Sequence, residues 1–199
     1  MTQADGGAQQ AGLPAFQDMS VREFLAAVAS GRAAPGGGSA AAAAVGLGAA
    51  LCAMAARLSS RQLTSATAAE LAAAADDLAS TAAALIQADA ESFQQVLAAR
   101  QPRPGQELSA ADMSPAAAIP MQVIETATQV ARLAARLVVA GNPNLRGDAV
   151  TGLLLAQAGA KAASVLVEID LGSVPADDRR RRAAQLLSDI ADAASAALR

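Results

Sequence analysis

The sequence has 199 residues, a formal net charge of −3, no histidine and one cysteine. This length suits one domain with a real core, and the negative charge argues against nucleic-acid binding, which requires a basic surplus or patch. With no histidine and one cysteine, we expect neither a transition-metal site nor an intrachain disulfide, and a reducing cytoplasm fits.

The first residues are expected to form a tail followed by a short helix. Residues 1–16 have neither the basic nor the apolar segment of a signal peptide, so a flexible tail is expected before a single domain, 17–199. Ser20 and Glu23 form the pattern of a capping box ahead of an apolar run. Gly31 is expected to close the short helix that they begin.

A second helix is expected from about Gly37 to Leu58, and it opens on "PGGGSA" at 35–40. Three glycines at a helix start favour a place where the backbone comes close to another group or adopts positive φ. The free N–H groups of the first turn, with Ser39, could bind an anion or a carbonyl oxygen. The alternative is that the glycines let two helices cross closely.

The uncharged stretch 39–56 raises the possibility of a membrane span. Alanine and glycine dominate it, its length is marginal, and no other segment is expected to match it. We therefore expect no membrane partner.

A third helix is expected over 65–99, and its heptad pattern leaves Asp89 where a core residue belongs. A carboxylate in that position would be desolvated and its pKa raised, as in many acid–base groups. A structural carboxylate that caps a neighbouring helix or pairs with an arginine is an equally good interpretation.

Prolines and a glycine within 100–115 interrupt the helical pattern. Ser114 is expected to cap a fourth helix with Pro115 at its first position, and Pro120 to kink or restart it before it ends at Gly141. A fifth helix is expected over about 149–169, and a last one that ends near Arg199. Because no alternating β pattern is found, the predicted fold is all-α, an antiparallel bundle of five or six helices.

Two polar clusters accompany these helices. Residues 179–182 are four arginines that follow two aspartates, which favours a solvated, partly self-paired face. In "GNPNLRGD" at 141–148, Asn142, Asn144 and Asp148 lie close enough in sequence to bind a polar planar ligand. Turn chemistry for the asparagines and helix N-capping for Asp148 are their more common roles.

Taken in order, several stretches resemble the cyclodeaminase/cyclohydrolase family, the helical domain also found at the C-terminal end of formimidoyltransferase-cyclodeaminase. They are "SVREFLAAVASGRAAPGGGSAAA" from Ser20, "DAESFQQV" at 89–96, "IP" at 119–120 and "GNPNLRGD" at 141–148. The resemblance implies a helical homodimer that acts on a one-carbon group carried by tetrahydrofolate. It would close formimidoyltetrahydrofolate to methenyltetrahydrofolate with release of ammonia, or hydrolyse methenyltetrahydrofolate to the formyl form.

The resemblance also implies the site residues. Asp89 and Asp148 would be catalytic, because both reactions pass through a tetrahedral carbon between two nitrogens and require a proton to be moved. The expected substrate-binding residues are Gly36, Gly37, Gly38, Ser39, Asn142 and Asn144. No cofactor beyond the tetrahydrofolate substrate and no metal are expected.

Two other functions stay open at this point. The same fold could act on a different small molecule with an iminium-like or amidine-like carbon, or the chain could be a non-catalytic helical dimer. Independently of any family, long alanine-rich helices in a chain of this size leave apolar faces uncovered, which predicts a homodimer.

Overall fold

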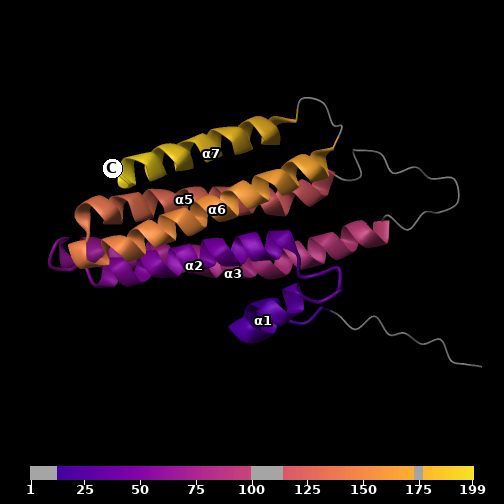
Figure 1. Ribbon diagram of the computed structural model, residues 1–199, viewed down its shortest axis with the longest axis horizontal. Coiled ribbons are helices and arrows are strands. Elements are labelled where there is room, and N and C mark those ends of the chain that lie inside the picture. Colours follow the sequence, from indigo (N-terminus) through magenta and orange to yellow (C-terminus); the bar gives the residue numbers. More distant parts are fainter. Residues whose placement is uncertain (1–12, 100–113, 173–176) are drawn as a thin grey trace, which may run out of the picture.

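The computed structural model describes residues 13–99, 114–172 and 177–199, and all regular structure in these ranges is helical. The helices are α1 (Val21–Val28), α2 (Gly37–Arg57), α3 (Ser65–Ala99), α5 (Ala118–Ala140), α6 (Arg146–Leu171) and α7 (Asp178–Ala197), with 3₁₀ turns at Phe16–Asp18, Ser114–Ala117 and Pro143–Leu145. The predicted all-α antiparallel bundle is confirmed (Figure 1).

The arrangement of the long helices decides which residues can meet. Helix α2 packs mainly on α3 and α6, α5 packs on α6, and α7 lies against α5 and α6, while the short α1 lies beside the bundle on the side of α2 and α3 (Figure 1). Successive long helices run in opposite directions. The start of α2, the end of α3, the start of α5 and the end of α6 therefore lie at one end of the bundle, and the start of α6 lies at the other.

Helices α2 and α6 cross at glycines. A Cβ atom on Gly48 would lie 2.7 Å from the carbonyl oxygen of Gly152, and one on Gly159 would lie 2.8 Å from the carbonyl oxygen of Ala41. The absence of side chains at these positions is what allows the two backbones to approach. Cys52 is fully buried near this crossing, and burial raises the pKa of its thiol to about 12, as expected for a small core residue rather than a nucleophile.

Helix ends agree with the sequence-based expectations in part. The capping box is confirmed, since the Ser20 Oγ accepts a hydrogen bond from the Glu23 N–H at 3.3 Å and the Glu23 carboxylate accepts one from the Ser20 N–H at 2.8 Å. Pro115 does not open an α-helix, because residues 114–117 form a 3₁₀ turn. Pro120 instead lies in the first turn of α5, where a missing N–H costs no helical hydrogen bond.

The other expected ends show one further difference. Helix α6 begins at Arg146, three residues earlier than expected, so that Asp148 lies inside the first turn and is not the N-cap. The arginine run is partly self-paired as expected, with Arg179 bound to Asp177 at 2.7 Å and Arg181 bound to Asp178 at 2.6 Å, whereas Arg180 binds Glu168 on α6 at 2.7 Å.

The expectation that only one segment has the composition of a membrane span is wrong. By length and composition alone, both Gly37–Arg57 and Pro143–Leu171 could cross a membrane, with 56% and 39% of their most apolar windows buried in the fold. These windows lie in α2 and α6, which pack on each other. The packing of α2 on α6 accounts for the buried part of each window. The rest of each window is not buried and forms an apolar outer face.

Of the expected N-terminal tail, residues 1–12 lie outside the described part of the chain, as does most of the expected break at 100–115. Phe16 is only 2% exposed and packs with Ala27, Ala34 and Ala90 in a small cluster between α1 and α3. This cluster attaches α1 to the bundle close to the start of α2.

Candidate functional site

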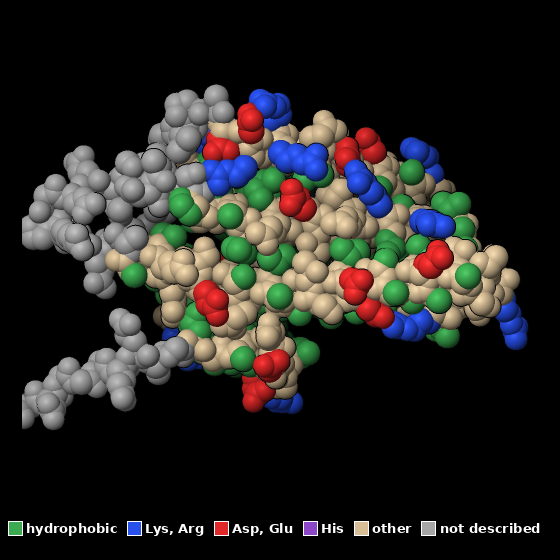
Figure 2. All heavy atoms as spheres, turned by 180° about the vertical axis from the view of Figure 1, so that it is seen from behind, with side chains coloured by type: hydrophobic (Ala, Val, Ile, Leu, Met, Phe, Trp, Pro, Cys, Tyr) green, Lys and Arg blue, Asp and Glu red, His purple; other side chains and the backbone are tan. Residues whose placement is uncertain are grey.

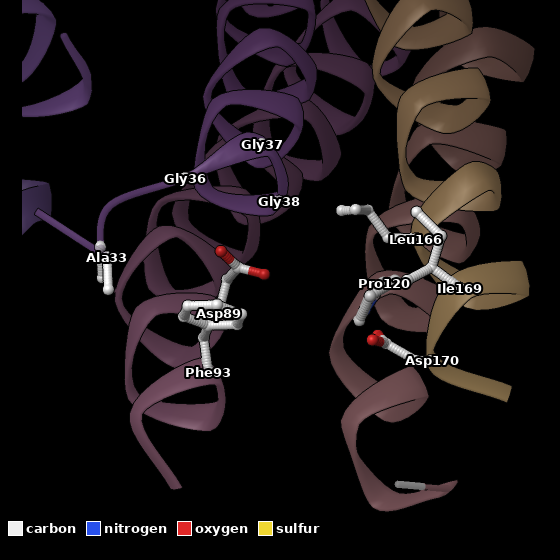
Figure 3. A pocket seen from close by; sticks show the side chains of 11 residues that line it. Ala33, Gly36, Gly37, Gly38, Asp89, Phe93, Pro120, Leu166, Ile169 and Asp170 are labelled. Atoms are coloured by element: carbon white, nitrogen blue, oxygen red, sulfur yellow. The ribbon is translucent and has the colours of Figure 1, made fainter. Parts of the chain in front are cut away.

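Asp89 lies on α3 directly beneath the first turn of α2 (Figure 3). Its Oδ2 is 2.9 Å from the hydroxyl oxygen of Ser39, which is fully buried. The predicted anion-binding position at the start of α2 is therefore taken up by the chain's own carboxylate.

Gly38 makes room for this carboxylate. A Cβ atom at residue 38 would lie 1.9 Å from the Asp89 Oδ1 and 2.5 Å from its Cγ, whereas one at Gly37 would meet nothing within 4 Å. Close approach, the first of the two roles expected for the glycines, thus applies to Gly38. None of the three glycines has positive φ; Gly172 is the positive-φ glycine of the described residues.

Burial raises the pKa of the Asp89 carboxyl, and hydrogen bonds from the hydroxyl and backbone N–H of Ser39 oppose that rise without cancelling it. The Ser39 hydroxyl has one proton but faces two acceptors, because its oxygen is also 3.0 Å from the carbonyl oxygen of Ile86. A protonated Asp89 could donate to Ser39 while Ser39 donates to Ile86. This arrangement satisfies all three oxygens and favours a carboxyl that holds its proton.

The carboxyl of Asp89 faces a cleft of about 190 Å³ between the starts of α2 and α5 and the ends of α3 and α6. Its walls are Ala33, Ala34, Gly36, Gly37, Gly38, Asp89, Phe93, Pro120, Leu166, Ile169 and Asp170. A smaller hollow of about 120 Å³ adjoins it and shares Asp89, Phe93 and Asp170 with it. Most of the lining is apolar, so polar groups at its ends act in a poorly solvated environment.

Asp170 lies across the cleft from Asp89, and the two carboxylates point toward the space between α3 and α6 (Figure 3). Sequence analysis did not single it out. A signal was available, however, because Asp170 lies in the last turn of α6, where the negative end of the helix dipole disfavours an acidic side chain. An acid at a position that the helix disfavours is a reason to look for another role.

The remaining predicted residues lie at the opposite end of the bundle. Asp148 and Asp170 belong to one helix and are separated by 22 positions, which corresponds to about 33 Å along its axis. One chain therefore brings together Gly36–Gly38, Ser39 and Asp89, but not Asp148 or the two asparagines.

At that far end, Asn142 has a clear structural role. Its backbone N–H donates to the Ser59 Oγ at 2.8 Å, and its side-chain Nδ2 donates to the carbonyl oxygen of Leu58 at 3.1 Å. Its Oδ1 accepts a hydrogen bond from the Asn144 N–H at 3.1 Å. Asn142 thus fastens the turn after α5 to the turn after α2, which is the turn chemistry considered above.

The cleft can accommodate a small planar group between apolar walls and move a proton at either of two carboxyls. In the described part of the chain, no group of three or more His, Cys, Asp or Glu side chains is placed to hold a metal ion. Proton transfer and electrostatic stabilisation of a cationic carbon are the reactions that such a lining suits.

Comparisons with known proteins concern the family and the fold of the chain. A family model described as formiminotransferase-cyclodeaminase matches residues 20–189. No curated protein sequence matches the chain. Among solved structures, the crystal structure of formiminotetrahydrofolate cyclodeaminase from Thermotoga maritima is similar, with a TM-score of 0.80 and 23% sequence identity over 91% of this chain and 94% of that chain. At this identity the likeness shows a shared fold.

Proposed function

Since the chain belongs to the formiminotransferase-cyclodeaminase family, we propose that it is a folate one-carbon enzyme that closes formimidoyltetrahydrofolate to methenyltetrahydrofolate with release of ammonia. Hydrolysis of methenyltetrahydrofolate to formyltetrahydrofolate is the second reaction that the same site would support. The observation that carries the proposal is Asp89, a carboxyl with a raised pKa that faces an apolar cleft.

The cyclisation requires one proton to change places. N10 of the folate attacks the carbon of the protonated formimidoyl group, so that a new N10–C bond forms and the carbon becomes tetrahedral. The proton on N10 must then pass to the departing amino group, which leaves as ammonia when its C–N bond breaks. The positive charge stays on the methenyl product, and a single carboxyl that gives its proton to the amino group and takes the proton of N10 balances the step.

We assign this transfer to Asp89. A carboxyl with a raised pKa is a better match to nitrogen bases near neutral pH than an ordinary aspartic acid is, because proton transfer is most efficient when the catalytic pKa lies near the working pH. Asp170 on the opposite wall would stabilise the cationic carbon through its negative charge. Phe93 and Pro120 offer apolar surfaces to the pterin ring.

The hydrolytic reaction uses the same groups with water as the nucleophile. Water adds to the methenyl carbon and gives one proton to a carboxyl. The ring then opens as one C–N bond breaks, the carboxyl returns its proton to the departing nitrogen, and the hydroxyl proton passes to solvent as the formyl C=O forms. Asp148, Asn142 and Asn144 are not needed for either proton transfer in this scheme, and a role for them in substrate binding would require a second subunit.

The test is to incubate the purified protein separately with formimidoyltetrahydrofolate and with methenyltetrahydrofolate. We expect ammonia release and a rise in the near-ultraviolet absorbance of methenyltetrahydrofolate with the first substrate, and a loss of that absorbance if the second reaction also occurs. Rates equal to those in buffer for both substrates would rule the proposal out and favour a different amidine or iminium substrate.

A further inference from the structure

Ser92 lies one helical turn after Asp89 on α3, and its hydroxyl differs from the other shielded hydroxyls of the chain. Thr81, Thr126 and Thr128 each donate to the carbonyl oxygen four residues earlier in their helix, at 2.8 Å. In the described ranges, every other serine or threonine that is buried or half-buried has a hydrogen-bond partner within the chain, whereas the half-buried Ser92 has none. A hydroxyl that is partly shielded from solvent and unpaired calls for another molecule as its partner.

The side chain of Ser92 lines the smaller hollow that adjoins the cleft, together with Asp89, Phe93 and Asp170. Three of the seven residues that line this hollow are polar. Among the eleven residues that line the larger cleft, Asp89 and Asp170 are the polar side chains. The two carboxyls, which face each other in Figure 3, therefore lie on the boundary between an apolar cleft and a more polar hollow.

The volume of the hollow limits what can enter it. Pockets that hold whole ligands have volumes of roughly 300 Å³ or more, whereas a single water molecule requires only about 10–15 Å³ of accessible space. At about 120 Å³, the hollow is too small for a folate ring and large enough for a few molecules of water or ammonia. The apolar cleft beside it is the better place for a planar ring.

The outer surface shows no comparable concentration of polar groups on the face seen in Figure 2. Acidic and basic side chains are mixed along the helices of this face and form no patch of one sign. A mixed surface of this kind is typical of a solvated face rather than of a site for a charged ligand. The hollow, in contrast, gathers three polar side chains in one partly enclosed space.

We propose that the hollow holds the small reactant that the one-carbon carbon gains or loses, water in the hydrolysis and ammonia in the cyclisation, and that Ser92 positions it beside Asp89. The inference rests on the proposed function, and it gives a place to the reactant that the two reactions do not share. Side chains three residues apart on a helix have Cβ atoms about 5–6 Å apart. One molecule of water or ammonia can therefore contact the Ser92 hydroxyl and the Asp89 carboxyl at the same time.

In the hydrolysis, Ser92 orients the attacking water. One O–H of the water points to the Asp89 carboxylate, which takes its proton as the oxygen adds to the methenyl carbon. The Ser92 oxygen accepts a hydrogen bond from the other O–H, which leaves a lone pair of the water directed at the carbon. The proton held by Ser92 is the one that passes to solvent when the formyl C=O forms.

In the cyclisation, the same position receives the leaving group. The amino group takes the proton of Asp89, its C–N bond breaks with the electron pair on nitrogen, and ammonia forms in the hollow. Beforehand, the Ser92 oxygen accepts a hydrogen bond from one N–H of the amino group and so turns the nitrogen lone pair toward Asp89. The folate ring stays in the cleft, so Ser92 acts on the small reactant and not on the ring.

The first test separates binding of ammonia from binding of folate. The reverse of the cyclisation, addition of ammonia to methenyltetrahydrofolate, is followed at increasing ammonium concentration and fixed pH. Ser92→Val fills the hollow and removes the hydroxyl, so the KM for ammonia should rise by about tenfold or more, the scale of one lost hydrogen bond. Ser92→Ala should give a smaller rise, and the KM for the folate should stay nearly constant in both variants.

The matched controls are Ser80→Val and Ser80→Ala. Ser80 is an exposed residue of the same helix that also has no hydrogen-bond partner among the described residues, and it lines neither the cleft nor the hollow. Equal KM values for ammonia in Ser92→Val and Ser80→Val overturn the proposal, as does a rise in the KM for folate by the same factor. Circular dichroism checks folding; if Ser92→Val does not fold, Ser92→Ala decides, because alanine favours a helix more than serine does.

The second test needs no turnover. The carboxyls of 13C-labelled aspartates are titrated by NMR, and the Asp89 signal is identified by its loss in Asp89→Asn. Water in the hollow solvates the ionised carboxylate, so its displacement in Ser92→Val should raise the pKa of Asp89 further, whereas Ser80→Val should not. Among the described residues that line the cleft or the hollow, Asp170 is the other titratable group, so the same rise is expected in an Asp170→Asn background.

The two tests distinguish failure of the inference from failure of the proposed reaction. A pKa of Asp89 that Ser92→Val leaves unchanged overturns the inference even if the protein turns over both folates. A raised pKa in a protein that acts on neither folate supports water held by Ser92 beside Asp89 and rules out the folate reaction alone.

Discussion

Asp89 is the side chain whose surroundings differ most from those of an ordinary surface carboxylate. Sequence analysis located it through the heptad pattern of α3 but left open whether it was a structural or an acid–base group. Among the described residues, Asp89 has no arginine partner; its hydrogen bond is to Ser39, and one face of the carboxyl opens to the cleft. Both observations favour the acid–base interpretation.

The raised pKa of Asp89 predicts how stability depends on pH. From its ordinary value of 3.8 up to its value in the folded protein, the folded state holds a proton that the unfolded state has lost. Stability must therefore fall as pH rises through this interval. Relative to Asp89→Asn, which does not titrate, the unchanged protein should lose melting temperature as the pH rises above 3.8. A difference in melting temperature that stays constant over this range would mean that Asp89 is ionised throughout.

Asp170 shows what residue patterns in the sequence do not reveal. Its partner across the cleft is 81 positions away on another helix, and neither heptad spacing nor local motif connects them. Only the packing of the bundle, in which α2 and α5 each contact both α3 and α6, brings them to one cleft. Asp170→Asn should lower turnover of both substrates by reducing stabilisation of the cationic carbon, and it should affect binding of a folate without a cationic one-carbon group less. Steady-state kinetics on both substrates, with that folate as a competitive inhibitor, will show this.

At the scale of elements, the glycines at the start of α2 have different roles that substitutions can separate. Gly38→Ala places a Cβ atom on the Asp89 carboxylate and should displace it, so that turnover falls strongly. Gly37→Ala meets nothing within 4 Å and should leave folding intact, with a gain of up to about 1 kcal/mol from helix propensity. In an Asp89→Ala background, the effect of Gly38→Ala on stability should disappear, as a double-mutant cycle can measure.

The crossing of α2 and α6 provides a second test at this scale. A Cβ atom on Gly152 would lie 2.8 Å from the carbonyl oxygen of Gly48, a backbone atom that cannot move alone. Gly152→Ala should therefore destabilise the fold by about 1–3 kcal/mol, the usual cost of overpacking. Gly147→Ala on the same helix meets nothing within 4 Å and is the matched control. Urea unfolding that finds both variants equally stable would contradict the close crossing.

Helix positions were well predicted because apolar periodicity, capping residues and proline mark them in the sequence. The starts of α2 and α3 are confirmed at the expected residues. The start of α6 was placed too late because the 3₁₀ turn at 143–145 continues directly into the helix, and no side chain caps it. A helix without a capping side chain leaves no local mark of its first residue.

At the scale of the whole molecule, the connections between helices explain why only part of the predicted site comes together. Helices joined by short loops alternate in direction, so the loop after α5 must lie at the opposite end from the start of α2. This inference was available from the predicted helix order, and it separates Asp148 from Asp89 within one chain. Residues that a family pattern assigns to one site need not lie close together within a single chain.

The measurement that tests the central claim most directly is the pH–rate profile of the purified protein beside that of Asp89→Asn, with formimidoyltetrahydrofolate as substrate. If Asp89 carries the proton, kcat should fall by about a hundredfold or more in the variant, the usual scale of general acid–base assistance, while KM changes little. The unchanged protein should also show a limb whose midpoint lies above 3.8, the ordinary pKa of this carboxyl. An Asp89→Asn variant that keeps near-normal kcat and the same profile would contradict the assignment and leave Asp148 or Asp170 as the acid to test.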